Sequence, residues 1–174
     1  MRSIHSLMKA AGGNFARTNK FRLRFSVPFL RGIGADTIDA LANSVRYPGF
    51  SHETVTLNIK GHPVELPART RNNNEFSVTF YLDENYNIYE TFKYWIANID
   101  DYGVDPSGNL YDHANIPYGS CVIDVFDYSM TSTRKWLSIE MVYPTSISDI
   151  DYNTQGQNEI ATFTVIFKYI IKGN

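Results

Sequence analysis

The residue types that catalyse reactions or bind metals are scattered through this sequence, without the spacing that such chemistry requires. Two carboxylate pairs, Asp100–Asp101 and Asp149 with Asp151, fall in polar connections, where capping of turns explains them better than acid–base catalysis. The histidines occupy arm, loop and turn positions, and no two are spaced as a metal-binding pair on one element. They are His5, His52, His62 and His113. The sequence therefore predicts no metal centre.

Motifs for nucleophiles, phosphates and dinucleotides are missing as well. The chain has no Gly-x-Ser-x-Gly elbow and no Gly-x-x-x-x-Gly-Lys loop. Gly32 and Gly34 lack the third glycine of a dinucleotide-binding loop, so residues 32–44 are interpreted as a turn followed by a short helix or strand. The single cysteine, Cys121, lies in a predicted strand and is expected to be a small buried apolar side chain. We therefore expect no enzymatic activity and no cofactor.

The clearest structural pattern is in the last third of the chain, where two strands are joined by a polar connection. In the strand 135–143, Leu137, Ile139 and Met141 are predicted on one face and Val142 on the other. The last strand has apolar side chains at every second position, the period of a pleated strand. They are Ala161, Phe163, Val165, Phe167, Tyr169 and Ile171. Both strands therefore need a surface on which to pack.

The first strand has the same alternation. Phe21, Leu23 and Phe25 are predicted on one face, and Arg22 and Arg24 on the other, until Pro28 ends the pairing. The charged face of this strand must therefore reach water or acidic groups.

Residues 53–67 are predicted to form a hairpin with its turn at Lys60-Gly61-His62. One face is apolar: Val55, Leu57, Ile59, Val64 and Leu66. The opposite face is polar: Thr54, Thr56, Asn58, Lys60 and Glu65. Such a hairpin is typical of an antiparallel sheet with one face in water.

One amphipathic helix is predicted at about 85–99, capped by Asp83 or Asn85. Its apolar stripe is expected to pack on the sheet: Ile88, Phe92, Trp95, Ile96 and Ile99. Two further strands precede and follow it, at 75–82 and 120–128. With 174 residues, the chain is long enough for one domain. We therefore predict a mainly β fold, an antiparallel β-sandwich or barrel-like domain with one flanking helix, spanning 1–174 with 1–19 as an N-terminal arm.

Charge is distributed unevenly along the chain. The net charge is −2, yet seven of the 16 Lys and Arg precede Asp36 and no Asp or Glu does. The rest of the chain therefore holds nine basic residues against all 18 acids. A basic first segment is typical of a nucleic-acid-binding arm, or of a surface that meets acids on a neighbouring copy. A third interpretation is that these basic side chains are simply solvated and meet no partner.

Membrane insertion and export by a signal peptide are not expected. No apolar run approaches the roughly 20 residues of a membrane-spanning helix, and residues 1–20 lack the continuous apolar core of a signal peptide. The strands instead leave open sheet edges, with few prolines or lysines placed to protect them. Self-assembly through those edges is one physical solution.

Three patches of sequence, in order along the chain, carry a family resemblance. Asn14 to Phe21 is similar to a Phe-Ala-Arg-Pro-Asn-x-Phe entry into the first strand, with Thr18 where proline is common. Phe92-Lys93-Tyr94-Trp95 matches an aromatic helix core. The third patch comprises Tyr143-Pro144-Thr145, Asp151-Tyr152 and Asn158-Glu159-Ile160-x-Thr162-Phe163-x-Val165. With these patches the sequence resembles the tail tube proteins of T-even-like contractile-tailed bacteriophages, related in fold to type VI secretion and phage-like bacteriocin tube proteins.

The resemblance implies a structural subunit of the virion tail, assembled in the host cytoplasm. Members of the family form hexameric rings that stack into a hollow tube inside a contractile sheath. The implied partners are other copies of the chain, the tail sheath protein, the tape-measure protein, baseplate proteins, and double-stranded DNA that passes without specific binding. No membrane partner is implied. The alternatives are a baseplate or tail-completion adaptor, and the tube protein of a phage-derived secretion or bacteriocin machine.

Contacts between subunits and between rings are expected at two places. The basic residues Arg17, Lys20, Arg22 and Arg24 are predicted to meet acids on an adjacent copy. The hairpin is predicted to contribute through its polar side chains: Thr54, Thr56, Asn58, Lys60, His62 and Glu65.

Overall fold

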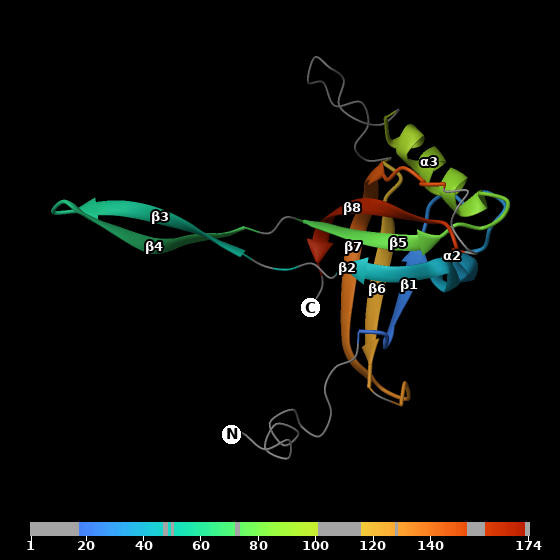
Figure 1. Ribbon diagram of the computed structural model, residues 1–174, viewed down its shortest axis with the longest axis horizontal. Coiled ribbons are helices and arrows are strands. Elements are labelled where there is room, and N and C mark those ends of the chain that lie inside the picture. Colours follow the sequence, from blue (N-terminus) through green and yellow to red (C-terminus); the bar gives the residue numbers. More distant parts are fainter. Residues whose placement is uncertain are drawn as a thin grey trace.

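The strands and helices follow one another in the order β1, α2, β2, β3, β4, β5, α3, β6, β7 and β8 (Figure 1). The structure is a computed structural model, and it describes residues 18–46, 49, 51–71, 74–100, 116–127, 129–152 and 159–172. Arg17 and most of the predicted 1–19 arm lie outside these residues, as do residues 101–115.

Six strands form one antiparallel sheet in the order β1-β6-β7-β8-β5-β2. Their bounds are Phe21–Ser26 (β1), Gly119–Phe126 (β6), Thr133–Ile147 (β7), Thr162–Lys172 (β8), Glu75–Tyr81 (β5) and Ala42–Arg46 (β2). In Figure 1 the group β1, β6 and β7 crosses the group β8, β5 and β2. The sheet therefore curls upon itself, which confirms the prediction of a mainly β, barrel-like fold.

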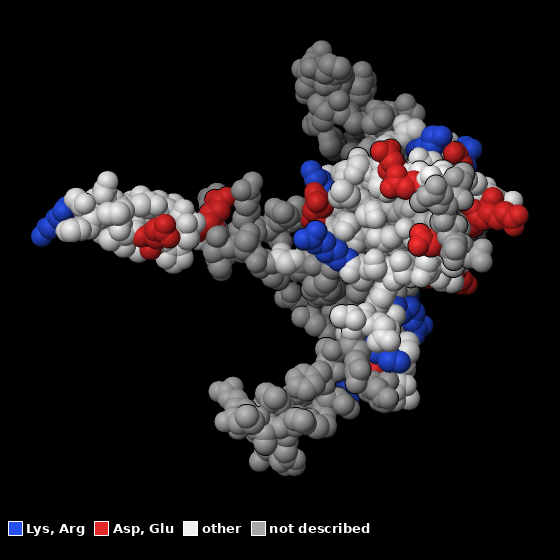
Figure 2. Space-filling view, in the orientation of Figure 1, with Lys and Arg blue, Asp and Glu red and all other residues white. Residues whose placement is uncertain are grey.

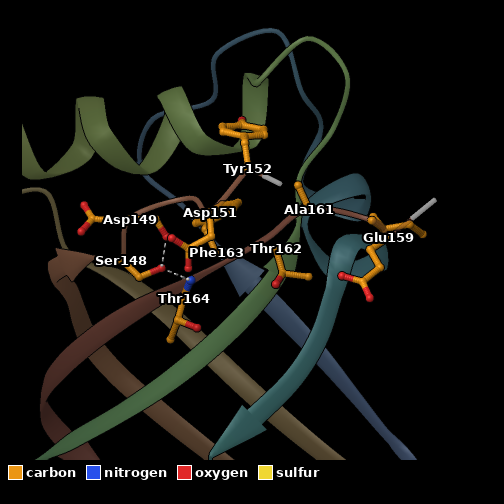
Figure 3. A pocket seen from close by; sticks show the side chains of 10 residues that line it. Ser148, Asp149, Asp151, Tyr152, Glu159, Ala161, Thr162, Phe163 and Thr164 are labelled. Atoms are coloured by element: carbon orange, nitrogen blue, oxygen red, sulfur yellow. Dashed lines mark hydrogen bonds between the residues drawn. The ribbon is translucent and has the colours of Figure 1, made fainter. Parts of the chain in front are cut away.

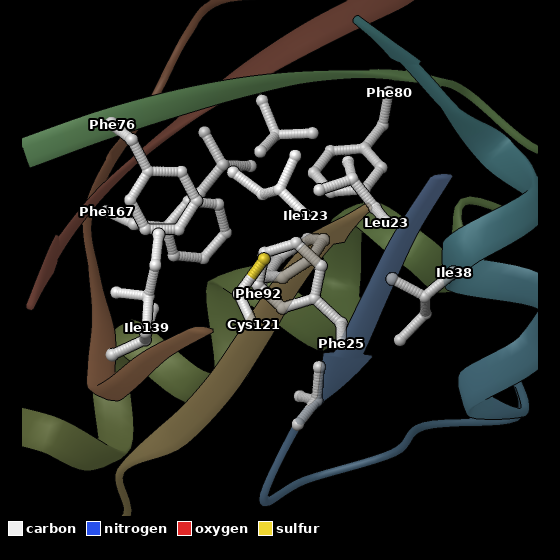
Figure 4. Close-up of a cluster of buried hydrophobic side chains, with 14 of the residues drawn as sticks. Leu23, Phe25, Ile38, Phe76, Phe80, Phe92, Cys121, Ile123, Ile139 and Phe167 are labelled. Carbon is white, nitrogen blue, oxygen red and sulfur yellow. The ribbon is translucent and has the colours of Figure 1, made fainter. Parts of the chain in front are cut away.

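Aromatic side chains fill the space between the two groups of strands. The ring of Phe25 on β1 lies 5.1 Å from that of Phe167 on β8 and 6.4 Å from that of Phe76 on β5, measured between ring centroids. Buried side chains from both groups point into one cluster, together with Cys121 (Figure 4). Burial raises the pKa of the Cys121 thiol far above its usual range, so this side chain is an apolar filler, as predicted.

The alternation in the sequence decides which side chains enter this core. On β8, Phe163, Val165, Phe167 and Tyr169 are all buried, as the period-two pattern predicted. The same holds for Leu23 and Phe25 on β1, and for Phe76, Val78 and Phe80 on β5.

Strand β7 departs from its predicted pattern at Met141. Opposite this residue the register shifts, with Gly119 facing Val142 and Ser120 facing Glu140, and Met141 has a φ of 53°. The extra residue of a β-bulge reverses the faces of the strand beyond it. Val142 is therefore buried and Met141 is not, so the predicted orientation of these two residues was wrong. The strand also continues through Pro144 to Ile147, further than predicted.

Helix α3, Asn87–Asp100, covers one end of the curled sheet. The Asp83 carboxylate accepts hydrogen bonds from the backbone N–H groups of Asn87 and Ile88, both at 3.0 Å, which confirms Asp83 as the cap. Ile88, Phe92 and Trp95 are buried against the core, as the apolar stripe predicted. Within residues 32–44, a second and shorter helix, α2 (Ala35–Leu41), leads directly into β2.

The remaining strands, β3 (Ser51–Ile59) and β4 (His62–Arg71), form a separate two-stranded sheet. It is inserted between β2 and β5, and it projects far from the rest of the molecule (Figure 1). The turn consists of Lys60 and Gly61 alone, with φ values of 51° and 84°, because Ile59 already pairs with His62. His62 therefore belongs to the strand and not to the predicted turn.

Close packing at Gly119 gives a first test of this fold. A Cβ atom there would lie 2.5 Å from the Ser26 carbonyl oxygen and 2.6 Å from the Trp95 ring. Gly119→Ala is therefore expected to lower the free energy of unfolding by about 1–3 kcal/mol, because backbone and core must move apart. Urea unfolding measures this change. Gly49→Ala is the matched control, since no atom lies within 4 Å of its added Cβ. Equal stability of the two variants would contradict the described packing.

Candidate assembly surfaces

The projecting hairpin is a ribbon with one apolar face and one polar face. Cross-strand neighbours share a face, and the register pairs Val55 with Leu66 and Leu57 with Val64. Ile59 extends this stripe toward the turn. All five side chains are exposed, from 38% for Val64 to 51% for Ile59. The hairpin thus carries a continuous apolar stripe that the described part of the chain does not cover.

This exposure differs from the expectation for a hairpin lying on a sheet. An isolated two-stranded hairpin is at best marginally stable in water, and contiguous exposed apolar stripes mark interaction surfaces. The stripe is therefore the strongest candidate for a contact with another molecule.

The polar hairpin residues predicted to make contacts fall in three places. Thr54, Thr56, Asn58 and Glu65 share the face opposite the apolar stripe, since Thr56 pairs with Glu65. Lys60 stands at the tip, in the turn. His62 pairs with Ile59 and so lies on the apolar face. All six side chains are exposed.

Of the basic residues predicted to make contacts, Arg22 and Arg24 lie on the outer face of β1, as predicted, whereas Arg17 lies outside the described residues. Arg24 contacts the nearly buried Asp124 of its own chain, with Nη2 and Nε at 2.9 and 3.0 Å from Oδ2. The Arg22 guanidinium lies 5.1 Å from the centre of the Phe126 ring. Lys20 precedes the strand and is half-buried. Arg24 thus has an acidic partner within its own chain, although its side chain is 57% exposed.

A hollow of about 760 Å³ lies where the chain passes from β7 to β8 (Figure 3). Its lining includes three carboxylates, Asp149, Asp151 and Glu159, and two largely exposed apolar side chains, Tyr152 and Ile160. The two sides of the hollow are separated in sequence by residues 153–158. The hollow therefore combines negative charge with exposed apolar surface.

Hydrogen bonds hold one wall of this hollow on β8. The backbone N–H of Ser148 donates to the Thr164 carbonyl at 2.8 Å, and the Ser148 hydroxyl accepts from the Thr164 N–H at 3.0 Å. The Tyr152 hydroxyl is 2.5 Å from that of Tyr86, which precedes α3. The wall is therefore positioned both by the sheet and by the start of the helix.

Charge differs between the hairpin tip and the body. Figure 2 shows basic charge at the far end of the hairpin, acidic side chains nearer its base, and further acidic side chains at the opposite end of the molecule. Among the described residues, the hairpin tip carries Lys60, and the hollow carries the three carboxylates named above.

Helix α2 protects the open edge of β1. Strand β1 pairs only with β6, so its other edge lacks a partner strand in the described sheet. The Asp39 carboxylate of α2 accepts a hydrogen bond from the backbone N–H of Phe25 at 2.8 Å. Burial raises the pKa of Asp39 above its usual value of 3.8, with a further increase from Asp36, and the bond from Phe25 opposes this shift.

Other classes of site receive no support from the described part of the chain. In it, no three His, Cys, Asp or Glu side chains gather as a metal site. Nor does any helix there have the length and apolarity needed to cross a membrane.

The fold is similar to that of several solved structures. A chain of the sheath–tube complex of an extracellular contractile injection system, PVC, in the extended state is similar with a TM-score of 0.59 and 13% identity, over 99% of this chain and 97% of that one. The tube-terminating cap of the anti-feeding prophage is similar with a TM-score of 0.59 and 12% identity, over 92% of this chain and 90% of that one. The sheath/tube terminator of PVC is similar with a TM-score of 0.59 and 13% identity, over 91% of this chain and 95% of that one. A comparison with the sequences of curated proteins gives no match.

The curled antiparallel sheet with its two helices is thus similar in fold to chains from the tube and cap assemblies of contractile systems. The family model "Phage tail tube protein" matches residues 16–171. The chain belongs to the phage tail tube protein family, which confirms the resemblance carried by the three sequence patches.

Sequence reasoning missed the surfaces that involve exposed apolar side chains. The stripe of Val55, Leu57 and Ile59 was recognised as one face of a hairpin, but its period is the same whether that face is covered or bare. Tyr152 and Ile160 belong to the family patches, and that membership was the only signal that set them apart. The link from Asp39 to Phe25 had no signal in the sequence.

The hydrogen bond at the β1 edge allows a test with two substitutions. Asp39→Ala removes the acceptor for the Phe25 N–H and is expected to lower the free energy of unfolding by about 1–2 kcal/mol. Asp39→Asn keeps an acceptor oxygen without the charge, so its stability is expected to stay close to that of the wild type. Thermal unfolding of the three proteins measures both effects.

The pH dependence of this pair follows from the raised pKa of Asp39. A carboxyl whose pKa is higher in the folded state favours folding when protonated, and this contribution is lost as the pH rises through the folded pKa. The wild type should therefore gain stability relative to Asp39→Asn as the pH falls from neutral to below 3.8. If the wild type instead lost stability relative to Asp39→Asn as the pH fell, the fold would prefer the charged form of Asp39.

Proposed function

We propose that this chain is the structural subunit of a phage tail tube, forming hexameric rings that stack into a hollow conduit for DNA inside a contractile sheath. Membership of the tail tube family and the tube-like fold support this function. The observation that carries the assembly step is the bare apolar stripe of the hairpin, which needs a cover that the described part of the chain does not supply.

Ring formation would use the edge of β2 and the outer face of the curled sheet, because α2 already covers the edge of β1. The sheet ends at β1 on one side and β2 on the other, so a ring that covers the edge of β2 leaves neither edge exposed. A head-to-tail contact that closes makes a ring, and one that stays open makes a filament. We propose both kinds of contact here, closed around the ring and open along the tube, with residues 1–174 as one building unit and 1–19 as an arm.

The conduit role requires a wall that does not hold DNA. Neutral or acidic side chains along the lumen repel phosphates or leave them solvated, so a duplex slides without specific binding. On the outer face of β5 and β8, Thr79 and Thr164 hydrogen-bond to each other at 2.9 Å, and Glu75 stands opposite Lys168 further along, so these paired positions carry no net charge.

The partners that we propose follow the same role. Beyond its own copies, the subunit would contact a tail sheath protein, a tape-measure protein and baseplate proteins, within a virion tail assembled in the host cytoplasm. The basic residues Arg17, Lys20, Arg22 and Arg24 are proposed to meet acids on a neighbouring copy. The polar hairpin residues Thr54, Thr56, Asn58, Lys60, His62 and Glu65 are proposed to border the contact made by the apolar stripe.

A second candidate is a cap or adaptor that ends a tube, in a phage or in a derived injection machine. The similar solved structures include a tube-terminating cap and a sheath/tube terminator, so the fold alone does not separate the two roles. A cap uses one end of the molecule and stays a single ring. A tube subunit uses both ends and polymerises.

Negative-stain electron microscopy of the purified protein separates these functions. Long hollow tubes are expected from the wild type, whereas monomers or single rings would favour the cap or adaptor. Leu57→Ser with Val64→Ser removes the centre of the apolar stripe and is expected to abolish tubes. The free energy of unfolding of the monomer should change by only about 0.5 kcal/mol, because both side chains are already exposed.

The matched control retains apolar area at the same two positions. Leu57→Met with Val64→Ile should still form tubes, because contact area and not the identity of the side chain is needed. Normal tubes from the Ser double variant would show that the stripe is not an assembly contact.

The basic face of β1 is tested best at Arg22. Arg22→Glu is expected to slow tube growth, because the charge that meets a neighbouring acid is reversed. Growth is followed by light scattering at low and high salt. Reversing Arg24 as well would place a negative charge beside the nearly buried Asp124, so the double variant tests folding together with assembly. Arg22→Lys, which keeps the charge, should behave as the wild type, and equal growth of the Glu and Lys variants would remove Arg22 from the interface.

A further inference from the structure

The hairpin and the acidic hollow lie at opposite ends of the same pair of strands. Strands β5 and β8 are antiparallel, with Glu75 opposite Lys168 and Tyr81 opposite Thr162. The hairpin joins the body just before Glu75, whereas the hollow is built around Thr162 at the start of β8. A second copy in the same orientation, placed beyond the hairpin end, would therefore bring its hollow to the first copy's hairpin. Placed beyond the other end, it would bring its hairpin to the first copy's hollow.

The two ends complement each other in chemistry. The hairpin offers an apolar stripe with Lys60 at its tip, and the hollow offers Tyr152 and Ile160, which are 66% and 67% exposed, beside Asp149, Asp151 and Glu159. Bringing the apolar side chains together removes area from water at both ends. The opposite charges favour an orientation in which Lys60 faces the carboxylates, because turning the polar face of the hairpin toward them would bring Glu65 beside like charges.

The hairpin is long enough for this contact. Strand β3 has nine residues, which at about 3.3 Å per residue span about 30 Å. Strand β5, with seven residues, spans only about 23 Å by the same rise. The tip of one copy therefore extends well beyond its own sheet.

We propose that the hairpin of one copy docks into the acidic hollow between β7 and β8 of the next copy, with Lys60 beside Asp149, Asp151 and Glu159 and the apolar stripe against Tyr152 and Ile160. This inference rests on the proposed tube function, and it names the surface that receives the hairpin. The contact joins unlike surfaces and leaves a free hairpin and a free hollow at the two ends of any stack, so it adds copies without limit.

Cysteine cross-linking tests the pairing directly. Copies with Lys60→Cys are mixed with copies with Asp151→Cys and treated with a short bis-maleimide. The native Cys121 is fully buried and does not compete. A cross-linked dimer is expected from the mixture, and a ladder of multimers from a chain that carries both substitutions. Met130→Cys, at an exposed site in the turn between β6 and β7, replaces Asp151→Cys as the matched control and should give neither product.

Charge reversal provides the second arm of the test. Lys60→Glu should cause loss of tubes, and adding Asp151→Lys to the same chain should restore them in part, because Asp149 and Glu159 remain. Tubes without cross-linking between positions 60 and 151 would overturn this contact and leave the proposed function standing. Cross-linked dimers in a protein that never forms tubes would support the contact and overturn the tube function.

Discussion

The contact on which the rest of the structure depends is the packing of aromatic rings between the two halves of one curled sheet. Phe25 on β1 touches Phe76 and Phe167 across the interior, and Phe92 of α3 closes the end at 5.0 Å from Phe80. Offset and tilted rings at these separations attract one another in addition to burying apolar area. Because this core is complete within the curled sheet and the helices α2 and α3, the hairpin is not needed to fill it.

The same alternating pattern thus has two different outcomes in one chain. On β5 and β8 the apolar face turns into the core, and Phe80 and Phe163 are fully buried. On β3 the apolar face of Val55, Leu57 and Ile59 meets no part of the described body. Period-two hydrophobicity specifies that a strand has an apolar face, but the cover for that face comes from tertiary or quaternary structure. The exposure of the stripe is therefore information that only the three-dimensional structure supplies.

Much of the body could be predicted from the sequence because its signals are local. The strands β1, β5, β6 and β8, the helix α3 with its Asp83 cap, and the buried Cys121 all follow from spacing and residue type. The bulge at Met141 could not, since it depends on how Gly119 pairs across the sheet. The hollow could not either, because Asp151 and Glu159 come together only when the chain returns onto β8. The features that could be predicted depend on local propensity, whereas the features that could not depend on long-range register.

Separating the core from the assembly surface has a physical consequence for how the protein works. If the hairpin filled the core, each change in the interface would also change the stability of the monomer. Here the apolar stripe is joined to the body only through the ends of β2 and β5, so its burial in an interface adds free energy of association without disturbing the aromatic packing. The edge of β1, in contrast, is already occupied by Asp39 of α2 and is protected from unspecific strand pairing. A chain with one bare apolar ribbon and a guarded edge has few ways to associate with its own copies, which favours an ordered tube over an amorphous aggregate.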